Sequence, residues 1–553
     1  MNKFLLLPLF FFILIHPCKS QLKFIIDDFE GFSNGTSDLK DNGVFSFGNI
    51  KASIVSHLNL KRTPPDYLGN RYIILKNDIY KEFGGWGKGI CVNVELDPAN
   101  DYFNFYVNQP DPLSGKKIKI QLQEDDNDSN KYEKESDDNF VYTMEIVPSG
   151  KEWQLVTIPL SKFKDENSGG DESFNCTYKK GKLLCFIISF ENIQKGSYGS
   201  LKKNQEIYFD FFSFSKGPLM QDAKKLVSNE NFCSLGLWST EGNSAKFAEI
   251  ASGFQSLFKN DSEKNIGIVH FFQPFAVDGG TTQNNYPSVE RIDKVLQQGN
   301  IPMITLENHF VNISAKNSRS VIKQPNLYNI IHGQCDDFFI NWAKQIKNVK
   351  GTILLRILHE FNGDWYPWCI SNNDHNADLL VQAFRHIHDI FAKEQVTNVK
   401  FIWCPNSMSV PQEKWNYIMD AYPGDEYVDF VGLDVYNGAG ESTIWTSFRK
   451  VGIENYFLLT EELPLKPLLI CETASRERKS NENVNVQNKS EWIEQMSSAL
   501  KSDMSKIRLI SWFNEREYFK INSSDQSRNA YLNYILKDGY FKSGTKDFMN
   551  LIR

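Results

Sequence analysis

Ile353-Leu354-Leu355-Arg356-Ile357 is a short apolar run, and seven similar runs recur along the C-terminal part of this sequence. Runs of this length are typical of buried strands, and a longer segment compatible with a helix or loop follows each one. Strand and helix that alternate eight times are typical of a (β/α)8 barrel. The other runs are Cys233–Leu237, Ile266–His270, Ile301–Thr305, Lys400–Trp403, Asp429–Leu433, Pro467–Cys471 and Ile507–Trp512.

An open, doubly wound parallel sheet is the alternative to the barrel for such a pattern. Sheets of that kind usually bind phosphate groups through a glycine-rich turn. The sequence contains no Gly-x-Gly-x-x-Gly and no Walker-type motif. The absence of both motifs favours the barrel.

The segment from Leu22 to about Gly217 has a different pattern, with short alternating stretches such as Lys117–Gln123 and Trp153–Leu160. Period-two alternation with polar turns predicts antiparallel strands. We therefore expect a multidomain chain, in which an all-β, jelly-roll-like sandwich precedes the α/β TIM barrel. The predicted boundaries are a signal peptide at 1–20, the sandwich at 21–217, a linker at 218–228 and the barrel at 229–553.

Composition limits the functional classes. The chain has 553 residues, which favours two domains over one, and 23% of them are charged, which argues against disorder. With 61 basic and 68 acidic residues the net charge is -7, so the sequence lacks the basic excess of most nucleic-acid-binding proteins. Aromatic residues make up 14% of the chain, including 11 Trp, and they supply much flat surface.

The N-terminus predicts export. Met1-Asn2-Lys3 is followed by an apolar stretch from Phe4 to Ile15, and Cys18-Lys19-Ser20 fits a cleavage site after Ser20. The apolar stretch is shorter than the roughly 20 residues of a membrane span, which disfavours the alternative of an uncleaved anchor. Loss of Lys3 and Lys19 would change the net charge from -7 to -9. We expect a secreted, extracellular monomer that associates with neither membranes nor nucleic acid.

Glycosylation motifs and cysteines agree with this route. Loss of Cys18 from the nine cysteines leaves eight, an even number compatible with disulfides. Cys176 and Cys185 are the candidates for a local bridge. No Cys-x-x-Cys pair occurs and the histidines are scattered, so no metal site is predicted from them. The seven Asn-x-Ser/Thr motifs are at Asn34, Asn127, Asn175, Asn260, Asn312, Asn488 and Asn522.

Carboxylic acids follow three of the eight apolar runs. Active sites of such barrels lie where the strands end; Glu360 follows the fourth run, Asp434 the sixth and Glu472 the seventh. Glu360 shares parity with Arg356 along its strand and Glu472 shares parity with Ile470, so alternation predicts that both glutamates point into the barrel. Two facing glutamates are what glycoside hydrolysis requires. The structural alternative is that each glutamate merely pairs with an arginine or caps a helix.

The segment His359-Glu360-Phe361-Asn362-Gly363-Asp364-Trp365, followed by Asp434-Val435-Tyr436 and Glu472-Thr473-Ala474-Ser475, resembles glycoside hydrolase family 26. That family contains mainly β-mannanases, with some β-glucanases and β-xylanases. The resemblance covers roughly Asn229 to Tyr540. It implies a retaining mechanism, with Glu360 as general acid/base and Glu472 as nucleophile.

The resemblance also implies roles around the two glutamates. Tyr436 would orient the nucleophile, His359 would contact the sugar, and Trp365 and Trp512 would form the floor of the subsites. Position alone adds three candidates for substrate binding: Asp434, Trp403 and His309. The sequence departs from the common family pattern at Phe361, where Met is frequent, and at 473–475, where Phe-Gly-Ser is frequent. These departures adjoin the catalytic positions and affect the expected substrate more than the expected activity.

The N-terminal part resembles, more loosely, the carbohydrate-binding β-sandwich modules that accompany polysaccharide hydrolases. The supporting segments include Asp27-Asp28-Phe29-Glu30-Gly31 near its start and Asp210-Phe211 near its end. In such modules early and late acids can hold a structural calcium ion, and a tryptophan such as Trp86 either stacks on sugar or fills the core. Catalysis itself is expected to require no cofactor.

The leading hypothesis is a secreted endo-β-glycanase that hydrolyses β-1,4-mannan, with polysaccharide as its partner. A β-1,3-1,4-glucanase and a β-1,3-xylanase are alternatives within the same family. A non-catalytic glycan-binding protein on a barrel scaffold is an alternative from another class. A retaining mechanism predicts that the two carboxyl groups lie about 5–5.5 Å apart.

Overall fold

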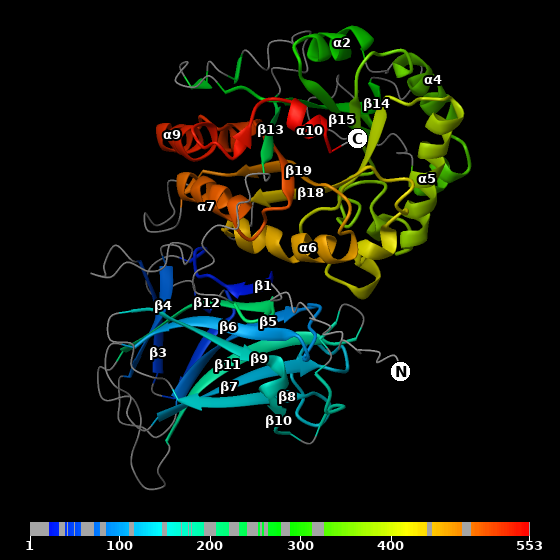
Figure 1. Ribbon diagram of the computed structural model, residues 1–553. Helices are drawn as coiled ribbons and strands as arrows, with labels where there is room; N and C mark the ends of the chain where they lie inside the picture. Colours follow the sequence, from blue (N-terminus) through cyan, green and yellow to red (C-terminus); the bar gives the residue numbers. More distant parts are fainter. Residues whose placement is uncertain are drawn as a thin grey trace, which may run out of the picture.

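The computed structural model contains a β-sandwich and a barrel that lie against each other, with helix α6 between them (Figure 1). It describes residues 21–551 apart from 33–38, 41, 49, 57–70, 78–83, 110–115, 146–151, 168, 175, 178–179, 193–205, 220–231, 240–252, 255–256, 259–263, 278–287, 312–325, 439–444 and 478–487. The predicted signal peptide and most of the predicted linker lie outside the described residues.

The sandwich consists of two antiparallel sheets. Alternating apolar residues from both sheets form its core, in which Phe103, Phe186 and Phe212 lie against Trp86 or against one another. Trp86 is fully buried, so it fills the core. The strands are β3 (Ile50–Ser56), β4 (Arg71–Asn77), β12 (Glu206–Lys216), β6 (Asp101–Asn108), β9 (Gln154–Pro159) and β1 (Gln21–Asp27) in one sheet, and β10 (Lys164–Asp165), β8 (Asn139–Glu145), β7 (Lys116–Asp125), β11 (Lys182–Asn192), β5 (Gly84–Val92) and β2 (Val44–Gly48) in the other.

Eight parallel strands close into a barrel, because the first strand pairs with both the second and the last. Each predicted apolar run overlaps one of these strands, so the (β/α)8 prediction is confirmed. The strands are β13 (Cys233–Trp238), β14 (Ile268–Val277), β15 (Ile301–Val311), β16 (Ile353–Ile357), β17 (Val399–Trp403), β18 (Phe430–Asn437), β19 (Leu468–Ser475) and β20 (Ile507–Phe513), and the short β21 (Phe541–Lys542) extends the sheet beside β13.

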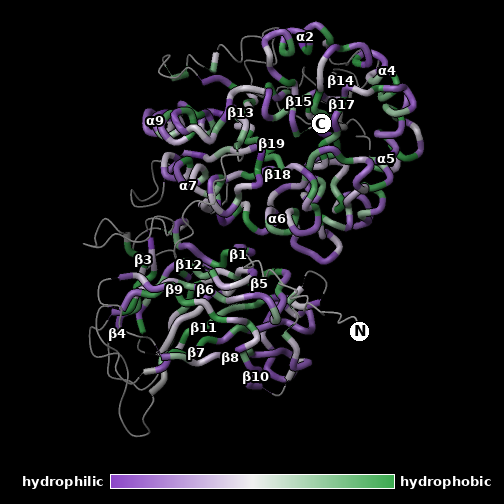
Figure 2. Tube along the Cα trace, viewed as in Figure 1, coloured by the Kyte–Doolittle hydropathy of each residue, from purple (hydrophilic) through white to green (hydrophobic). Residues whose placement is uncertain are grey.

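The helices form the outer layer of the barrel (Figure 1). Hydrophilic and hydrophobic residues alternate along them, as expected for helices with one buried face (Figure 2). Within the described ranges, no helix has the length and apolar character needed to cross a membrane. The helices are α2 (Val289–Gln297), α3 (Leu327–Ile331), α4 (Asp336–Ile346), α5 (Ala377–Lys393), α6 (Phe448–Glu462), α7 (Lys489–Lys501), α8 (Arg516–Phe519), α9 (Asp525–Tyr531) and α10 (Lys546–Met549).

The barrel strands present two apolar faces. One cluster, which includes Met303, Leu354, Ile402 and Leu509, fills the interior. A separate and larger cluster joins the opposite strand faces to the surrounding helices, and Ile470 belongs to it. The cluster to which a strand residue belongs shows whether its side chain points into the barrel or toward the helices. Alternate residues along the inward face therefore reach the mouth of the barrel.

The two domains are docked through α6 and β1. The amide of Gln21 donates to Thr460 Oγ1 at 2.9 Å, and Lys23 Nζ lies 4.9 Å from the ring centroid of Phe457. Lys450, near the start of α6, pairs with the buried Asp27 at 3.6 Å. The interface therefore combines a hydrogen bond and a cation–π contact with an ion pair whose carboxylate is buried.

The predicted bridge between Cys176 and Cys185 is not formed in this structure, where both residues are free thiols. Cys185 Sγ lies 2.8 Å from Gln123 Oε1 on the neighbouring strand, whereas Cys176 is buried in the sandwich core beside Glu124. The short spacing between the two cysteines did not indicate that their side chains have different neighbours.

Three of the predicted glycosylation sites fall within the described residues. Asn127 and Asn522 are exposed, whereas the side chain of Asn488 accepts a hydrogen bond from the backbone of Glu491 as the N-cap of α7. Glycosylation at the exposed pair stays a prediction. Asn34, Asn175, Asn260 and Asn312 lie outside the described residues.

Candidate active site

A cleft of about 640 Å³ lies at the carboxyl ends of the barrel strands. Both Glu360 and Glu472 line it. Aromatic side chains form much of its wall, and polar side chains come from several different strands. The remaining lining residues are Trp238, Phe272, Glu307, Trp365, Tyr366, Asn406, Ser407, Met408, Val410, Tyr436, Gly438, Thr446, Val451, Phe513, Glu515, Arg516 and Phe519.

Glu360 is held by the loop that follows β16. Leu358 and Glu360 have φ values of 49° and 51°, a left-handed conformation that is uncommon for residues other than glycine and is often found at functional sites. The backbone amide of Glu360 donates to the carbonyl of Cys404 at 2.8 Å. The indole of Trp365 donates to Glu360 Oε2 at 2.8 Å. One hydrogen bond at the backbone and one at the side chain therefore hold the carboxyl group of Glu360 at the cleft wall.

The surroundings of Glu360 favour its protonated form. Burial, and secondly the charge of Glu472, raise the pKa of Glu360 to about 7, while the hydrogen bond from Trp365 and the charge of Arg356 act in the opposite direction. A carboxyl group with such a pKa can donate a proton near neutral pH.

Glu472, on β19, accepts hydrogen bonds from two side chains. Arg356 Nη2 donates to Glu472 Oε1, and the hydroxyl of Tyr436 donates to Oε2 at 2.5 Å. The same guanidinium donates to Asp434 Oδ2 at 2.6 Å and to Thr305 Oγ1 at 2.7 Å. These contacts fix the orientation of the Glu472 carboxyl group. The site thus contains one carboxyl group suited to donate a proton and a second one that is held in place from two sides.

The alternation argument for Glu472 is wrong, although the residue does reach the cleft. Ile470, which shares its parity, belongs to the outer cluster, whereas Leu469 and Cys471 face the interior. The pairing of β18 with β19 shifts between Leu433 and Asp434, so that Asp434 pairs with Glu472 and Cys471 is an extra residue. This irregularity turns Glu472 inward.

Glu360 does not reach the cleft by strand alternation either. Arg356 faces the interior as expected, but β16 ends at Ile357 and Leu358 belongs to the outer cluster. The left-handed turn at Leu358 and Glu360 then redirects the chain. Glu360 lines the cleft, and the turn rather than the strand parity explains its position.

Four predicted substrate-binding residues do not line the cleft. Trp403 and Trp512 are buried, and their indoles donate to the carbonyls of Ala421 and Phe519. Both side chains lie on the strand face that points toward the helices. Phe513, and not Trp512, therefore lines the cleft. The sequence-based prediction of these two residues did not take the direction of their side chains into account.

The other two residues, Asp434 and His359, lie beneath the cleft. Asp434 is fully buried and holds Arg356, while His359 is 1% exposed and its Nε2 lies 3.2 Å from the hydroxyl of Tyr366. In this structure they position Arg356 and Tyr366, respectively. Of the remaining predicted residues, Trp365 and Tyr436 line the cleft. His309 lies in β15, and its side chain is outside the described part of the chain.

The sequence argument missed Trp238, Phe272, Glu307 and Phe513, all of which line the cleft. Each shares the inward parity of its strand, as Ile268 does for Phe272 and Met303 does for Glu307. A consistent extension of the inward alternation one step past each apolar run would have found them.

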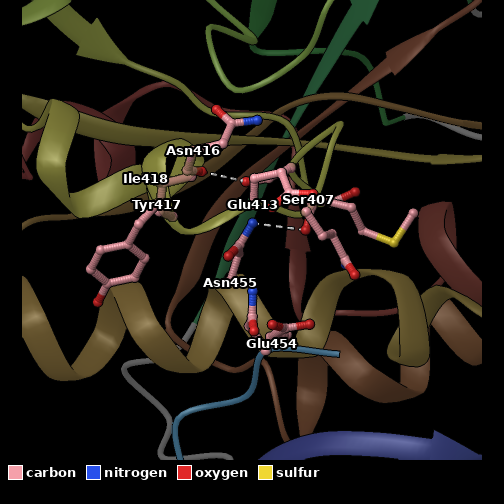
Figure 3. A pocket seen from close by; sticks show the side chains of 11 residues that line it. Ser407, Glu413, Asn416, Tyr417, Ile418, Glu454 and Asn455 are labelled. Carbon is pink, nitrogen blue, oxygen red and sulfur yellow. Dashed lines mark hydrogen bonds between the residues drawn. The ribbon is translucent and has the colours of Figure 1, made fainter. Parts of the chain in front are cut away.

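A second, smaller pocket lies beside the loop that follows β17 (Figure 3). Its volume is about 30 Å³, close to the space of one or two water molecules. The side-chain amide of Asn455, on α6, donates to the carbonyl of Ser407 at 2.8 Å across it, as Figure 3 shows. The pocket contains neither of the paired glutamates, so the larger cleft is the candidate active site.

Residues 246–508 match the family model of glycosyl hydrolase family 26. This match confirms the family resemblance that the motifs around Glu360 and Glu472 indicated. The matched segment contains the strands that carry both glutamates.

Curated relatives agree with this assignment. Endoglucanase H of Acetivibrio thermocellus is 31% identical over 281 residues, which are 50% of this chain and 28% of that protein. Mannan endo-1,4-beta-mannosidase A and B of Caldalkalibacillus mannanilyticus is 28% identical over 121 residues, which are 21% of this chain and 23% of that protein. The chain thus spans about a quarter of the length of these relatives.

Solved structures include the Bacillus subtilis mannanase BCman, with 18% identity, a TM-score of 0.39, and coverage of 56% of this chain and 87% of that one. A ruminal GH26 endo-beta-1,4-mannanase has 14% identity and a TM-score of 0.39, with coverage of 89% of this chain and 97% of that one.

Proposed function

We propose that this chain, whose residues 246–508 form a glycosyl hydrolase family 26 domain, is an endo-β-glycanase that hydrolyses β-1,4-mannan-type polysaccharides. The observation that carries the proposal is the pair of unlike carboxyl groups in one aromatic cleft. Glu360 has a pKa of about 7, and Glu472 is held by Arg356 and Tyr436. Mannan endo-1,4-beta-mannosidases among the curated relatives support the choice of substrate.

The proposed mechanism is a double displacement. Glu360 donates its proton to the glycosidic oxygen while Glu472 attacks the anomeric carbon, so the leaving sugar departs and a glycosyl-enzyme ester forms. Esterification removes the negative charge of Glu472 and, with it, one cause of the raised pKa of Glu360. Glu360 then takes a proton from water, which attacks the ester and releases Glu472. The aromatic side chains of the cleft supply flat apolar surface for the sugar rings.

Two alanine variants test these roles. We expect Glu360→Ala and Glu472→Ala each to lower kcat on mannan by at least about 10³-fold, while the melting temperature shows that the fold is retained. Glu394→Ala, at the end of α5 and away from the cleft, is the matched control and should keep wild-type activity. Near-wild-type activity of either active-site variant on mannan, glucan and xylan would show that the assigned roles are wrong.

The stereochemistry of the product tests the double displacement separately. Proton NMR of the first product formed should show the β-anomer, because two successive inversions retain configuration. Initial release of the α-anomer would contradict nucleophilic attack by Glu472 and would indicate a single displacement by water.

A β-glucanase is the second candidate. It is favoured by the match to Endoglucanase H, which extends over 281 residues compared with 121 for the mannosidase of C. mannanilyticus. Rates on mannan, mixed-linkage β-glucan and β-1,3-xylan, measured with the same preparation, decide between the substrates. Binding of these polymers without release of reducing ends would indicate a glycan-binding protein instead.

Secretion belongs to the same proposal, since the polymer substrates lie outside the cell. Residues 1–20 supply the predicted signal peptide, and Asn127 and Asn522 are exposed acceptors for glycans. N-terminal sequencing of protein from the medium of a eukaryotic host should begin at Gln21. Retention of the full chain in the cells would contradict export.

A further inference from the structure

The hairpin between β7 and β8 gathers three carboxyl groups at one end of the sandwich. Glu124 is near the end of β7, Asp126 follows the strand, and Asp138 precedes β8. Carboxylate oxygens of all three lie within 4.8 Å of one another. Two oxygen ligands of one calcium ion, at about 2.4 Å from it, are at most about 4.8 Å apart, so the three carboxylates are close enough to share an ion.

The neighbouring acids of this hairpin have different partners. Asp125 accepts hydrogen bonds from the backbone amides of Ser129 and Asn130, at 3.1 and 2.8 Å. Asp137 accepts from the backbone amides of Asp126 and Glu133, at 3.2 and 2.6 Å. These two acids therefore stabilise the loop itself. The carboxyl groups that converge are instead those of Glu124, Asp126 and Asp138.

The converging carboxylates have ligand atoms to spare. Asp138 is fully buried, and its Oδ2 has no hydrogen-bond partner within the described residues. Asp126 Oδ2 is also buried and has no such partner. No lysine or arginine in the described ranges forms an ion pair with Asp126 or Asp138. Buried, unpaired carboxylate oxygens this close together repel each other, so the arrangement requires a cation or protons.

A second loop closes over the cluster. The backbone amide of Glu172 lies 3.4 Å from Asp138 Oδ1. At Gly170, φ is +72°, and a Cβ there would lie 1.9 Å from Asp138 Oδ1 and 2.8 Å from Asp126 Oδ2. Glycine thus lets the backbone approach the carboxylates directly. The two loops therefore meet at the carboxylates.

The acids that the family resemblance suggested for calcium are less suitable. Asp210 lies close to the early acids, and among those early acids Asp27 and Glu30 are already paired with cations of the protein itself. Two of these cations come from the sandwich and one comes from α6. The ion pairs are Lys88–Asp27, Lys450–Asp27 and Arg71–Glu30.

We propose that Glu124, Asp126 and Asp138 form a calcium site that holds the 125–139 loop against the 169–174 loop. Asp126 and Asp138, which form no ion pair with a lysine or arginine of the described residues, converge with Glu124 and suit a hard divalent cation with oxygen ligands. The 125–139 loop also contacts the barrel, since Lys414 Nζ donates to Asp128 Oδ2 at 2.7 Å and to the carbonyl of Lys180 at 3.3 Å. The ion therefore stabilises a loop that reaches the catalytic domain. This site is independent of the proposed hydrolase activity.

The test uses the full chain, freed of metal with a chelator and then titrated with CaCl₂. Isothermal titration calorimetry should show one bound Ca²⁺, and 1 mM Ca²⁺ should raise the melting temperature by about 2–4 °C. Asp126→Asn and Asp138→Asn should each weaken binding at least about tenfold. Glu135→Gln is the matched control, because Glu135 is an exposed acid of the same loop and is not one of the three ligands.

The sign of the effect without metal distinguishes the proposal from a general loss of stability. In chelator, both Asn variants should be at least as stable as the wild type, because each removes repulsion between carboxylates. In Ca²⁺ the order should reverse. The proposal is overturned if Ca²⁺ leaves the wild type unchanged, if Mg²⁺ at equal ionic strength has the same effect, or if the Asn variants respond like the wild type.

Discussion

The indole Nε1 of Trp365 donates a hydrogen bond to Oε2 of Glu360 at 2.8 Å. Trp365 is 36% exposed, so one residue both presents a ring to the cleft and acts on the pKa of the acid. The bond favours the ionised carboxylate, against the upward shift from burial and from Glu472. The pKa of Glu360 is thus a balance that single substitutions can move.

Trp365→Phe should raise the pKa of Glu360, because it removes a donor to the carboxylate while keeping an aromatic ring. In the wild type, kcat/KM should fall as pH rises through about 7, where Glu360 loses its proton. In the variant this alkaline limb should move to higher pH, and KM should rise as well. Trp415→Phe, outside the cleft, is the control. If the alkaline limb stayed at the same pH or moved to lower pH, the hydrogen bond from Trp365 would not set the pKa of Glu360.

Glu360→Gln should stabilise the protein at high pH while abolishing activity. The pKa of Glu360 is about 7 in the folded chain and 4.5 ordinarily, so the folded state binds the extra proton and the wild type loses stability as pH rises from 4.5 to 7. At pH 8 the glutamine variant should gain up to about 3 kcal/mol in unfolding free energy. At pH 4 the two proteins should be equal. Denaturant titrations at both pH values measure this, and equal stability at pH 8 would contradict the raised pKa.

Tyr436→Phe removes the 2.5 Å hydrogen bond to Glu472 but keeps the ring in the cleft. We expect kcat to fall by about 10²-fold with a smaller change in KM, because the bond orients the nucleophile. Tyr422→Phe is the control, since its hydroxyl bonds to Asp425 away from the cleft. A change in KM alone would indicate that Tyr436 only contacts substrate.

Arg356→Lys keeps the charge but loses the planar fork that reaches Glu472, Asp434 and Thr305 together. We expect a loss of about 2–4 kcal/mol in unfolding free energy, because buried carboxylates lose hydrogen bonds, and a large fall in kcat. Arg449→Lys, whose guanidinium pairs with Asp503 at 2.5 Å, should cost less than about 1 kcal/mol. Similar losses in both variants would mean that the network around Arg356 has no special role.

Lys450→Met tests the contact between the domains. Asp27 is 1% exposed and would lose one of its two cations, so we expect a cost of about 1–2 kcal/mol and faster proteolysis between the sandwich and the barrel. Lys294→Met removes an exposed pair with Glu290 and should change stability by less than about 0.5 kcal/mol. Equal digestion of both variants would argue against a role for Lys450 in docking.

Much of this could be predicted without a structure. Apolar runs such as Ile353–Ile357 and Leu468–Cys471 define strands, because an eightfold alternation of strand and helix leaves few folds that bury all its apolar faces. The motif around Glu360 and the acid at Glu472 predicted the two glutamates that line the cleft. Residues at strand ends reach the barrel mouth in any closed parallel barrel.

The direction of individual side chains could not be predicted in the same way. Trp512 and Phe513 are adjacent in sequence, yet one packs under the helices and the other lines the cleft. The local irregularity at Cys471 and the left-handed turn at Leu358 and Glu360 bring the two glutamates to one site. The irregularity at Cys471 has no sequence signal, because it arises from pairing with a neighbouring strand.

By itself, the sequence determined the order of strands and helices and the chemical identity of the two acids, since hydrophobic periodicity and residue type are local properties. Only the tertiary structure decided which aromatic rings line the cleft and how the surroundings of Glu360 and Glu472 come to differ. Burial, a charged neighbour and hydrogen bonds from Trp365, Arg356 and Tyr436 separate them. The contacts of Glu472 join residues far apart in the chain, so they exist only once the barrel has closed, whereas Trp365 and Glu360 belong to one loop.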